Sequence, residues 1–314
     1  MFEKLSVLVK NAQRICLAAH VSPDGDALGS CAALGLGLVK LGKEVTLLCD
    51  DPVPPRYAFL DVQTRPYDAA MKVDLCIYVD CSDAGRAGKA GALVGKVPTF
   101  CIDHHGTNPA FADENVIDPA MAATAQLILI AVDELGIPWD ARMASCLYVG
   151  LSTDSGNFSF GNCDAKALCA ASYLVEKGAR PAELCDKLYG NRPLSAVRLL
   201  GLGLSTLKMS LGGKVASLHV TRAMLTEAGA RDGDTEDMVN YAADLEGVEI
   251  AVFVKEAEGG TKASLRSRGE ADVSKLASYF GGGGHAKASG CFLKLGVAEA
   301  EAVLVKKACE MLTQ

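Results

Sequence analysis

Residues 20–30, HVSPDGDALGS, place three potential metal ligands in one short turn. They are His20, Asp24 and Asp26, and they lie between two apolar segments, ICLAA before the turn and CAALGLGLV after it. The first segment is typical of a buried strand. The second indicates a helix that begins near Asp26 and ends before Gly42, because a carboxylate suits the amide groups at a helix start and glycine often follows a helix end. We therefore expect a strand, a polar turn and a helix.

Three more apolar segments predict further strands, and each of them ends in acidic or histidine residues. They are KEVTLLCDD (43–51), VDLCIYVDCSD (73–83) and VPTFCIDHH (97–105). Helical patterns follow at residues 122–136, 141–152 and 164–188. Strands that are apolar throughout, with helical segments between some of them, predict a parallel sheet covered on both faces.

The pattern changes near YGNRPLSAVRLL (189–200), where the chain becomes less apolar. We predict a first domain at residues 1–190, a linker at 191–207 and a smaller α+β domain at 208–314. The second domain should contain strands at 214–221, 249–256 and 260–269, and a helix at 272–280. The expected fold class is α/β, with a parallel-sheet domain, a smaller α+β domain and an active-site cleft between them.

Composition limits the class of protein. The net charge of −7 argues against binding to long duplex nucleic acid, which usually needs a basic surface. The twelve cysteines form no C-x-x-C pair, and the N-terminus has no uninterrupted apolar stretch, so we expect reduced thiols in a cytoplasmic protein. The longest nearly apolar run, residues 27–39, is too short to span a bilayer, so no membrane association is expected.

Potential ligands follow three predicted strands, where parallel sheets usually bind their ligands. The chain has five histidines, and three of them lie at these strand ends. Asp154, after a predicted helix, could reach the same edge. Asp83 and Phe158 are more typical of a helix cap and a core residue. The strand-end set comprises His20, Asp24, Asp26, Asp80, Asp83, Asp103, His104 and His105.

Carboxylates mixed with imidazoles suit a hard or borderline divalent ion better than a thiolate zinc site. Six ligands are too many for one catalytic ion with open positions. They suit two ions about 3.5–4 Å apart that share a carboxylate, an arrangement that generates hydroxide and stabilises phosphoryl transfer. Asp80, alone at the end of a central strand, is the expected bridge.

The second domain carries a separate anion-binding pattern. Four consecutive glycines, 281–284, allow close approach of an anion to the backbone, and Arg266 offers a planar fork for phosphate. Residues 261–290 contain five Lys or Arg residues and two acids within a net-acidic chain. The pattern predicts a pocket for one short anionic ligand. The roles of Arg268 and Lys287 stay open.

These motifs resemble a known family. DHHG (103–106), preceded by HVSPDGDALGS and VDCSD and followed by STDSGNF, resembles the DHH phosphoesterase superfamily. ASLRSRG (263–269) and GGGGHAKASG (281–290) resemble its companion DHHA1 domain. The resemblance covers essentially the whole chain, and the length and domain pairing most resemble the NrnA-type nano-RNase/pAp phosphatase group.

The resemblance implies a role for each matching residue. Two divalent ions are expected, Mn²⁺ first and Mg²⁺ or Co²⁺ as alternatives. One would be held by His20, Asp24 and Asp80, and the other by Asp26, Asp80, His104 and Asp154. His105 would contact the scissile phosphate, and Asp103 would orient a neighbouring histidine. The far phosphate and base of the substrate would be held by Arg266, Ser267, Gly282, Gly283, Gly284 and His285.

The implied activity is hydrolysis of very short RNA or dinucleotides such as pApA to 5′-mononucleotides, as a 3′–5′ oligoribonuclease-type phosphodiesterase. A second implied activity is removal of phosphate from 3′-phosphoadenosine 5′-phosphate (pAp), a 3′(2′),5′-bisphosphate nucleotidase reaction. Members of the group often form homodimers. A cyclic-dinucleotide phosphodiesterase is an open alternative. A RecJ-like exonuclease, a family II pyrophosphatase and a non-catalytic nucleotide sensor fit less well, given the charge, the GGGGH segment and the complete ligand set.

Overall fold

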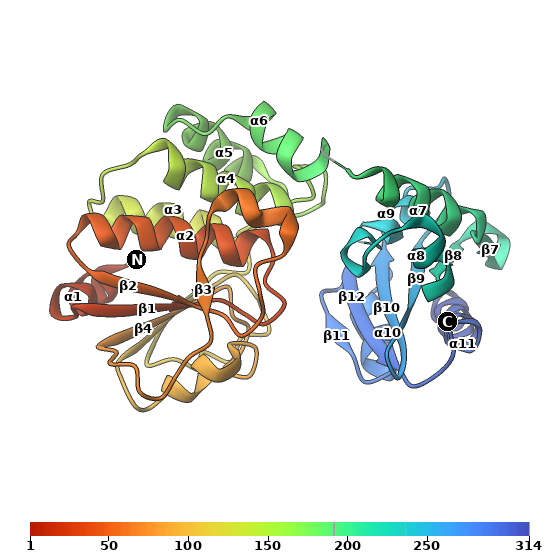
Figure 1. The fold of residues 1–314 in the computed structure, drawn as a ribbon, viewed down its shortest axis with the longest axis horizontal. Coiled ribbons are helices and arrows are strands. Elements are labelled where there is room, and N and C mark those ends of the chain that lie inside the picture. The colour runs from red at the N-terminus through yellow and green to blue at the C-terminus, as the bar shows by residue number, and fades with distance from the viewer. Residues whose placement is uncertain (191, 236, 314) are drawn as a thin grey trace. The chain divides into compact units, whose positions relative to one another are not determined.

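The computed structural model describes residues 1–190, 192–235 and 237–313 (Figure 1). The chain divides into two compact units, Met1–Asn191 and Arg192–Gln314, each with its own sheet. Asn191, the first residue of the predicted linker, and Gln314, the last residue of the second predicted domain, lie outside the described residues. No helix in the described ranges is long and apolar enough to cross a membrane.

The first unit is built on a six-stranded parallel sheet in the order β3-β2-β1-β4-β5-β6. The predicted parallel sheet is confirmed, and two short edge strands, β3 and β6, add to it. The strands are β1 (Arg14–Ala18), β2 (Glu44–Leu48), β3 (Thr64–Arg65), β4 (Leu75–Val79), β5 (Thr99–Asp103) and β6 (Glu114–Ile117). Because β1, β4 and β5 are neighbours, the residues that follow them meet at one sheet edge.

Helices cover one face of this sheet (Figure 1). Close helix packing is built into the sequence, since a methyl group on Gly29 would lie 2.3 Å from the carbonyl oxygen of Cys146. The expected start of α2 near Asp26 agrees with the structure: the helix begins at Gly25, Asp26 lies in its first turn, and Asp24 is its N-cap. Apart from a 3-10 helix on the opposite face, the helices of this unit are α1 (Glu3–Asn11), α2 (Gly25–Lys40), η1 (Pro55–Leu60), α3 (Thr124–Glu134), α4 (Ala141–Asp154), α5 (Ala165–Glu176), α6 (Pro181–Cys185) and the π-helical turn η3 (Asp186–Gly190).

The opposite face is covered without an α-helix. Tyr78 of β4 packs there against Phe111, and its hydroxyl donates to the carbonyl of Ala90 in the 3-10 helix η2 (Gly88–Leu93). Three cysteines of the central strands, Cys16, Cys76 and Cys101, are buried in this layer, and all twelve cysteines are free thiols. Both faces are therefore covered, but by different kinds of structure.

The second unit has a mixed six-stranded sheet, as predicted for an α+β domain. Its order is β11-β12-β10-β9-β8-β7, and β8 and β9 pair in parallel while the other pairs are antiparallel. The strands are β7 (Lys208–Ser210), β8 (Val215–Val220), β9 (Ile250–Ala257), β10 (Gly260–Ser267), β11 (Gly283–Gly284) and β12 (Ala288–Leu293).

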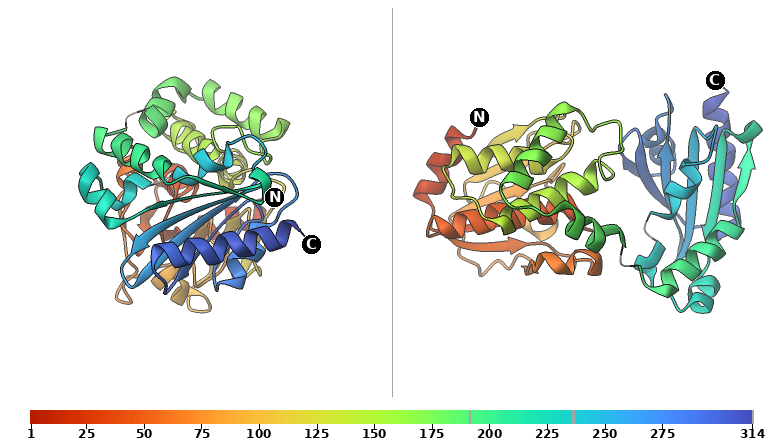
Figure 2. Two further views of the ribbon diagram at one scale, coloured as in Figure 1. Left: turned by 90° about the vertical axis from the view of Figure 1, so that its right-hand side faces the viewer. Right: turned by 90° about the horizontal axis from the view of Figure 1, so that it is seen from above.

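Helices lie on both faces of this second sheet (Figure 2). α10 (Val273–Tyr279) and α11 (Val297–Leu312) cover one face, and α7 (Leu194–Ser205), α8 (Arg222–Ala228) and α9 (Met238–Ala243) cover the other, with the short helices η4 (Leu211–Gly213) and η5 (Asp232–Thr235) in connections. α7 occupies most of the predicted linker, and its Leu199 is buried in the core of the second unit. Most of the segment predicted as a linker is therefore helical and packed.

Candidate metal centre

The predicted ligands converge at the carboxyl edge of the first sheet. Among the described residues, three overlapping groups bring potential ligand atoms within 4.8 Å of one another. Asp80 belongs to two of the groups, and so does His104. The groups are His20, Asp24 and Asp80; Asp26, His104 and Asp154; and Asp80, His104 and His105. All six residues named as ligands from the sequence are included, together with His105.

Asp80 lies at the centre of this arrangement. It is 2% exposed and has a left-handed backbone, with φ of 60°, a conformation that aspartate adopts more readily than most non-glycine residues. Its Oδ2 lies 3.5 Å from His20 Nε2, and its Oδ1 lies 3.7 Å from His104 Nε2. The two oxygens of one carboxylate thus face two different imidazoles.

A backbone carbonyl lies beside the Nδ1 atom of each imidazole. His20 Nδ1 lies 2.9 Å from the carbonyl oxygen of Val21, and His104 Nδ1 lies 3.2 Å from that of Met121. A carbonyl oxygen can only accept a hydrogen bond, so the His104 contact favours a proton on Nδ1 and a lone pair on Nε2. His20 Nδ1 lies between this kind of acceptor and a donor, because Arg86 Nη2 is 3.0 Å away on its other side. Metal-binding histidines are commonly oriented by such outer contacts.

Asp26 is enclosed by the start of α3. It is 0% exposed, and its Oδ2 accepts from the Thr124 amide at 2.6 Å while its Oδ1 accepts from the Ala125 amide at 2.9 Å. The Ser30 hydroxyl also donates to Oδ1, at 3.1 Å. Asp24, in contrast, accepts from the amides of Asp26 and Ala27 as the cap of α2.

Electrostatics indicate that the site suits cations. Burial and the nearby charges of Asp80 and Asp154 raise the pKa of Asp26 well above its usual range. Burial, together with Asp24 and Asp80, raises the pKa of Asp154 to about 6. Buried and partly buried carboxylates so close together repel one another, and a divalent cation removes that cost. The oxygen and imidazole donors fit such ions.

His105 has a different set of contacts. Its Nδ1 donates to Asp103 Oδ1 at 2.7 Å, and Asp103 is 0% exposed. Asp103 Oδ1 also accepts from the His104 amide at 2.9 Å. Burial favours the neutral imidazole, but Asp103 and Asp80 together outweigh it and raise the pKa of His105. The neighbouring histidine that Asp103 contacts through its side chain is therefore His105.

Two polar residues of the site were not identified from the sequence. Asn108 donates to Asp103 Oδ2 at 2.7 Å and to the carbonyl of Cys81 at 3.0 Å, and so connects the loops after β4 and β5. The Thr124 hydroxyl donates to Asp80 Oδ1 at 2.8 Å. The position of Asn108, in the loop after the DHHG segment, was an available signal. Nothing local distinguishes Thr124 from an ordinary helix-start residue.

Two other candidates have structural surroundings. Asp83 Oδ1 accepts from the Arg86 amide at 2.8 Å, and Asp83 belongs to none of the ligand groups found in the described residues. The ring of Phe158 packs against Tyr148, with centroids 5.6 Å apart. Both residues match the structural interpretation favoured by the sequence.

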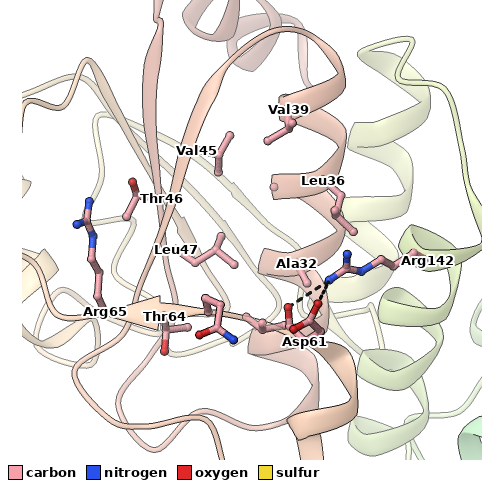
Figure 3. Close-up of a pocket in the computed structure, with 13 residues that line it drawn as sticks. Ala32, Leu36, Val39, Val45, Thr46, Leu47, Asp61, Thr64, Arg65 and Arg142 are labelled. Atoms are coloured by element: carbon pink, nitrogen blue, oxygen red, sulfur yellow. Dashed lines mark hydrogen bonds and ion pairs between the residues drawn. The ribbon is translucent and has the colours of Figure 1, made fainter.

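A cavity of about 420 Å³ lies elsewhere in the first unit (Figure 3). Figure 3 shows its apolar floor, formed by Leu36 and Val39 of α2 with Val45 and Leu47 of β2. An ion pair of 3.2 Å between Arg142 and Asp61 lies at one side. No member of the ligand groups lines this cavity.

In the second unit, Arg266 and Ser267 end β10. Arg266 is partly buried, and its Nη1 donates to the Leu265 carbonyl at 3.1 Å. Burial lowers its pKa, while Asp237 acts in the opposite direction. Ser267 is buried, and its hydroxyl donates to the Ala271 carbonyl.

Residues 281–290 form what we call the glycine-rich hairpin. Gly283 and Gly284 pair with β12, and the His285 amide donates to the Ala288 carbonyl at 2.7 Å. The amides of Gly281 and Gly282 also donate to protein carbonyls, at 3.0 and 2.8 Å. At least three amides of the GGGGH segment are thus engaged within the protein, which differs from an open anion-binding loop. His285 is exposed.

Comparisons with known proteins agree over both units. The chain matches the DHH family N-terminal domain over residues 14–151 and the DHHA1 domain over residues 212–314. A bifunctional oligoribonuclease and PAP phosphatase NrnA from Thermus thermophilus is 38% identical over 281 residues, which cover 89% of this chain and 84% of the relative. The protein of the same name from Bacillus subtilis is 27% identical and covers 88% of each chain.

Solved structures share the fold. An exopolyphosphatase-related protein from Bacteroides fragilis has a TM-score of 0.91 at 26% identity, covering 98% of this chain and 95% of that one. RecJ in complex with Mn²⁺ from Thermus thermophilus has a TM-score of 0.58 at 16% identity, covering 98% of this chain and 54% of that one, and it shows the fold alone. From the two domain matches and the similarity to the Thermus relative, we conclude that the chain belongs to the DHH/DHHA1 phosphoesterase superfamily and, within it, to the NrnA-type group.

Proposed function

We propose that this chain is a phosphoesterase that uses two divalent ions to hydrolyse very short oligoribonucleotides and dinucleotides such as pApA to 5′-mononucleotides, and to dephosphorylate pAp. The observation that carries the proposal is the position of Asp80, whose two oxygens face His20 and His104 at 3.5 and 3.7 Å. The names of the Thermus and Bacillus relatives, oligoribonuclease and PAP phosphatase, support the choice of substrates.

We assign the ligands in two sets that share Asp80. Bound there, the two ions would supply a hydroxide near neutral pH and neutralise charge on the phosphoryl oxygens. We propose Mn²⁺ as the resident ion, with Mg²⁺ or Co²⁺ as alternatives. His20, Asp24 and Asp80 would hold one ion, and Asp26, Asp80, His104 and Asp154 would hold the other.

His105 would contact the scissile phosphate. Its Nδ1 proton is held by Asp103, and Asn108 in turn holds Asp103, so the imidazole has a fixed orientation. The carboxylate also favours the protonated ring by raising the pKa of His105. A fixed, positively charged imidazole would bind phosphate oxygen or donate a proton to the leaving oxygen.

In the second unit, the far phosphate and the base would be held by the sequence-identified set. Arg266 would be the principal anion ligand, because its planar guanidinium suits phosphate. Ser267 belongs to the proposed site as its neighbour, while its hydroxyl fixes the strand end. The remaining proposed contacts are Gly282, Gly283, Gly284 and His285. The proposal also includes a cytoplasmic location, which the twelve free cysteines support, and a homodimer.

The deciding experiment is release of AMP from pApA by the purified full-length chain. We expect turnover with Mn²⁺, loss of turnover in EDTA and recovery when Mn²⁺ is restored in excess. The same assay with pAp, cyclic di-AMP and RNA of increasing length separates the alternatives. Preference for long RNA would favour the exonuclease alternative, and turnover of cyclic di-AMP alone would favour the cyclic-dinucleotide phosphodiesterase. Nucleotide binding without turnover under any metal condition would contradict the proposal.

A further inference from the structure

Thr124, the first residue of α3, contacts two of the proposed ligands. Its hydroxyl donates to Asp80 Oδ1 at 2.8 Å, and its amide donates to Asp26 Oδ2 at 2.6 Å. The residue is 0% exposed. We infer that Thr124 is a positioning residue that selectively stabilises binding of the ion on the His104 side of the centre. This inference rests on the proposed two-metal function.

The hydroxyl acts on one particular oxygen of Asp80. Oδ1 is the oxygen that faces His104 Nε2, at 3.7 Å, whereas Oδ2 faces His20 Nε2, at 3.5 Å. Rotation of an aspartate carboxylate about its terminal bond is normally loose. A hydrogen bond to Oδ1 inside the protein fixes the position of the oxygen that lies on the His104 side.

The amide acts on the second ligand of the same ion. With the neighbouring Ala125 amide, it holds both oxygens of Asp26, which groups with His104 and Asp154. The start of α3 therefore orients a ligand from the end of β4 and a ligand from α2. No contact connects Thr124 with His20 or Asp24 among the hydrogen bonds of the described chain.

Because these contacts are on one side of the centre, we expect the loss of the hydroxyl to weaken binding of one ion only. Removing the Thr124 hydroxyl removes a bond to the Asp80 oxygen that lies on the His104 side, whereas the contacts that place His20 and Asp24 do not involve Thr124. Loss of an outer-sphere partner typically reduces metal affinity by about 10- to 100-fold. We therefore expect that reduction at one of the two sites, and little change at the other.

The test is Mn²⁺ binding by the full-length chain without substrate, measured by calorimetric titration and by electron paramagnetic resonance of the spin-coupled ion pair. Thr124→Val keeps the side-chain shape and removes the hydroxyl, and Thr124→Ser restores it. We expect Thr124→Val to weaken one site by about 10- to 100-fold and to lose the coupled signal, and Thr124→Ser to bind like the parent.

Ser30→Ala is the matched comparison. It removes another buried hydroxyl, but one that donates only to Asp26, at 3.1 Å. We expect a smaller loss of affinity and a retained coupled signal. If Ser30→Ala and Thr124→Val behave alike, the claimed role of the Asp80 contact is overturned. Folding is checked by circular dichroism, and Thr124→Ala replaces Thr124→Val if the valine variant does not fold.

Failure of this inference can be told from failure of the proposed function. If the parent and Thr124→Val bind two ions with equal affinities while the parent hydrolyses pApA, only the role of Thr124 is lost. If Thr124→Val selectively loses one ion but the parent hydrolyses no nucleotide, the positioning role stands and the proposed activity falls. A parent that binds no ion pair overturns both.

Discussion

At the carboxyl edge of the first sheet, polar side chains are buried and already hold one another, whereas the glycine-rich hairpin of the second unit presents an exposed backbone with few side chains. Asp26 and Asp80 are 0% and 2% exposed, and amides or hydroxyls orient both of them. His285 and most of the preceding glycines are exposed. The polar groups of the first region are therefore buried side chains in fixed orientations, whereas those of the second region lie on an exposed segment.

This contrast follows from what each region is proposed to bind. Small divalent ions require fixed donors in fixed directions, so their ligands have to be arranged before the ion arrives. A nucleotide is larger and can be held by a few hydrogen bonds on an accessible surface. We therefore expect substitutions in the first region to reduce turnover strongly. Substitutions in the second region should mainly reduce the affinity for substrate.

The largest effect is expected from Asp80→Asn. Asparagine also tolerates the left-handed backbone at this position, so the change removes the charge of the proposed bridging ligand and keeps the local fold. Turnover of pApA should fall by about 1000-fold or more, because electrostatic stabilisation by both ions is lost. Metal content and melting temperature are measured in parallel. A variant that keeps two ions and about a tenth of parental turnover would contradict the claim that the first region depends on its fixed ligands.

A smaller effect is expected from Arg266→Ala. Loss of a charge-assisted bond to phosphate should raise KM for pApA by about 10- to 100-fold and leave Mn²⁺ content unchanged. Arg268→Ala is the matched control, because Arg268 is exposed and paired with Asp244. Lost metal with unchanged KM would show that the two regions do not divide the work as proposed.

Alanine substitutions at two glycines of the hairpin can distinguish an effect on packing from an effect on substrate binding. A methyl group on Gly282 would lie 2.2 Å from the Gly290 carbonyl oxygen and 2.5 Å from Cys291 Cβ, whereas one on Gly283 would meet no atom within 4 Å. Gly282→Ala should therefore lower stability by about 1–3 kcal/mol, as overpacking does. Gly283→Ala should leave the melting temperature near that of the parent, so a raised KM in that variant would report on substrate contact. Equal melting temperatures for the two variants would contradict the hairpin packing.

The smallest effect is expected from Asp74, a carboxylate at the opposite end of the first sheet. Asp74 accepts from the Arg14 amide at 2.8 Å and pairs with the Arg14 guanidinium, which holds its pKa well below the usual range. A lowered pKa stabilises the fold above the unfolded value of about 4, and this contribution is lost as the pH falls. Asp74→Asn should slightly lower the melting temperature at pH 7, with a difference that shrinks on acidification. A pH-independent difference would show that the charge is not the cause.

The sequence predicted the four central strands of the first sheet because each is an apolar run that ends in polar residues. It did not predict the edge strands β3, β6, β7 and β11 or the strand β12, which are short or carry no such run. It also identified all the residues of the ligand groups, since His20, Asp80 and His104 follow three such runs. It placed the start of α2 near Asp26, in agreement with the structure, but it did not show that Asp24 is the cap or that Asp26 is buried against α3. Most of the predicted linker is helix α7, because Leu199 packs into the core of the second unit. The local sequence pattern does not show that this core is present.

By itself, the sequence determined which residue types end the central strands and hence which side chains could meet at one edge, because strand pairing brings carboxyl ends together whatever the loops do. Only the tertiary structure decided how those side chains are oriented. Thr124 reaches Asp80 across 44 positions and Asp26 across 98, and the local pattern around Thr124 carries no trace of either contact. Hydrogen bonds between such distant positions exist only after the sheet and helices have packed.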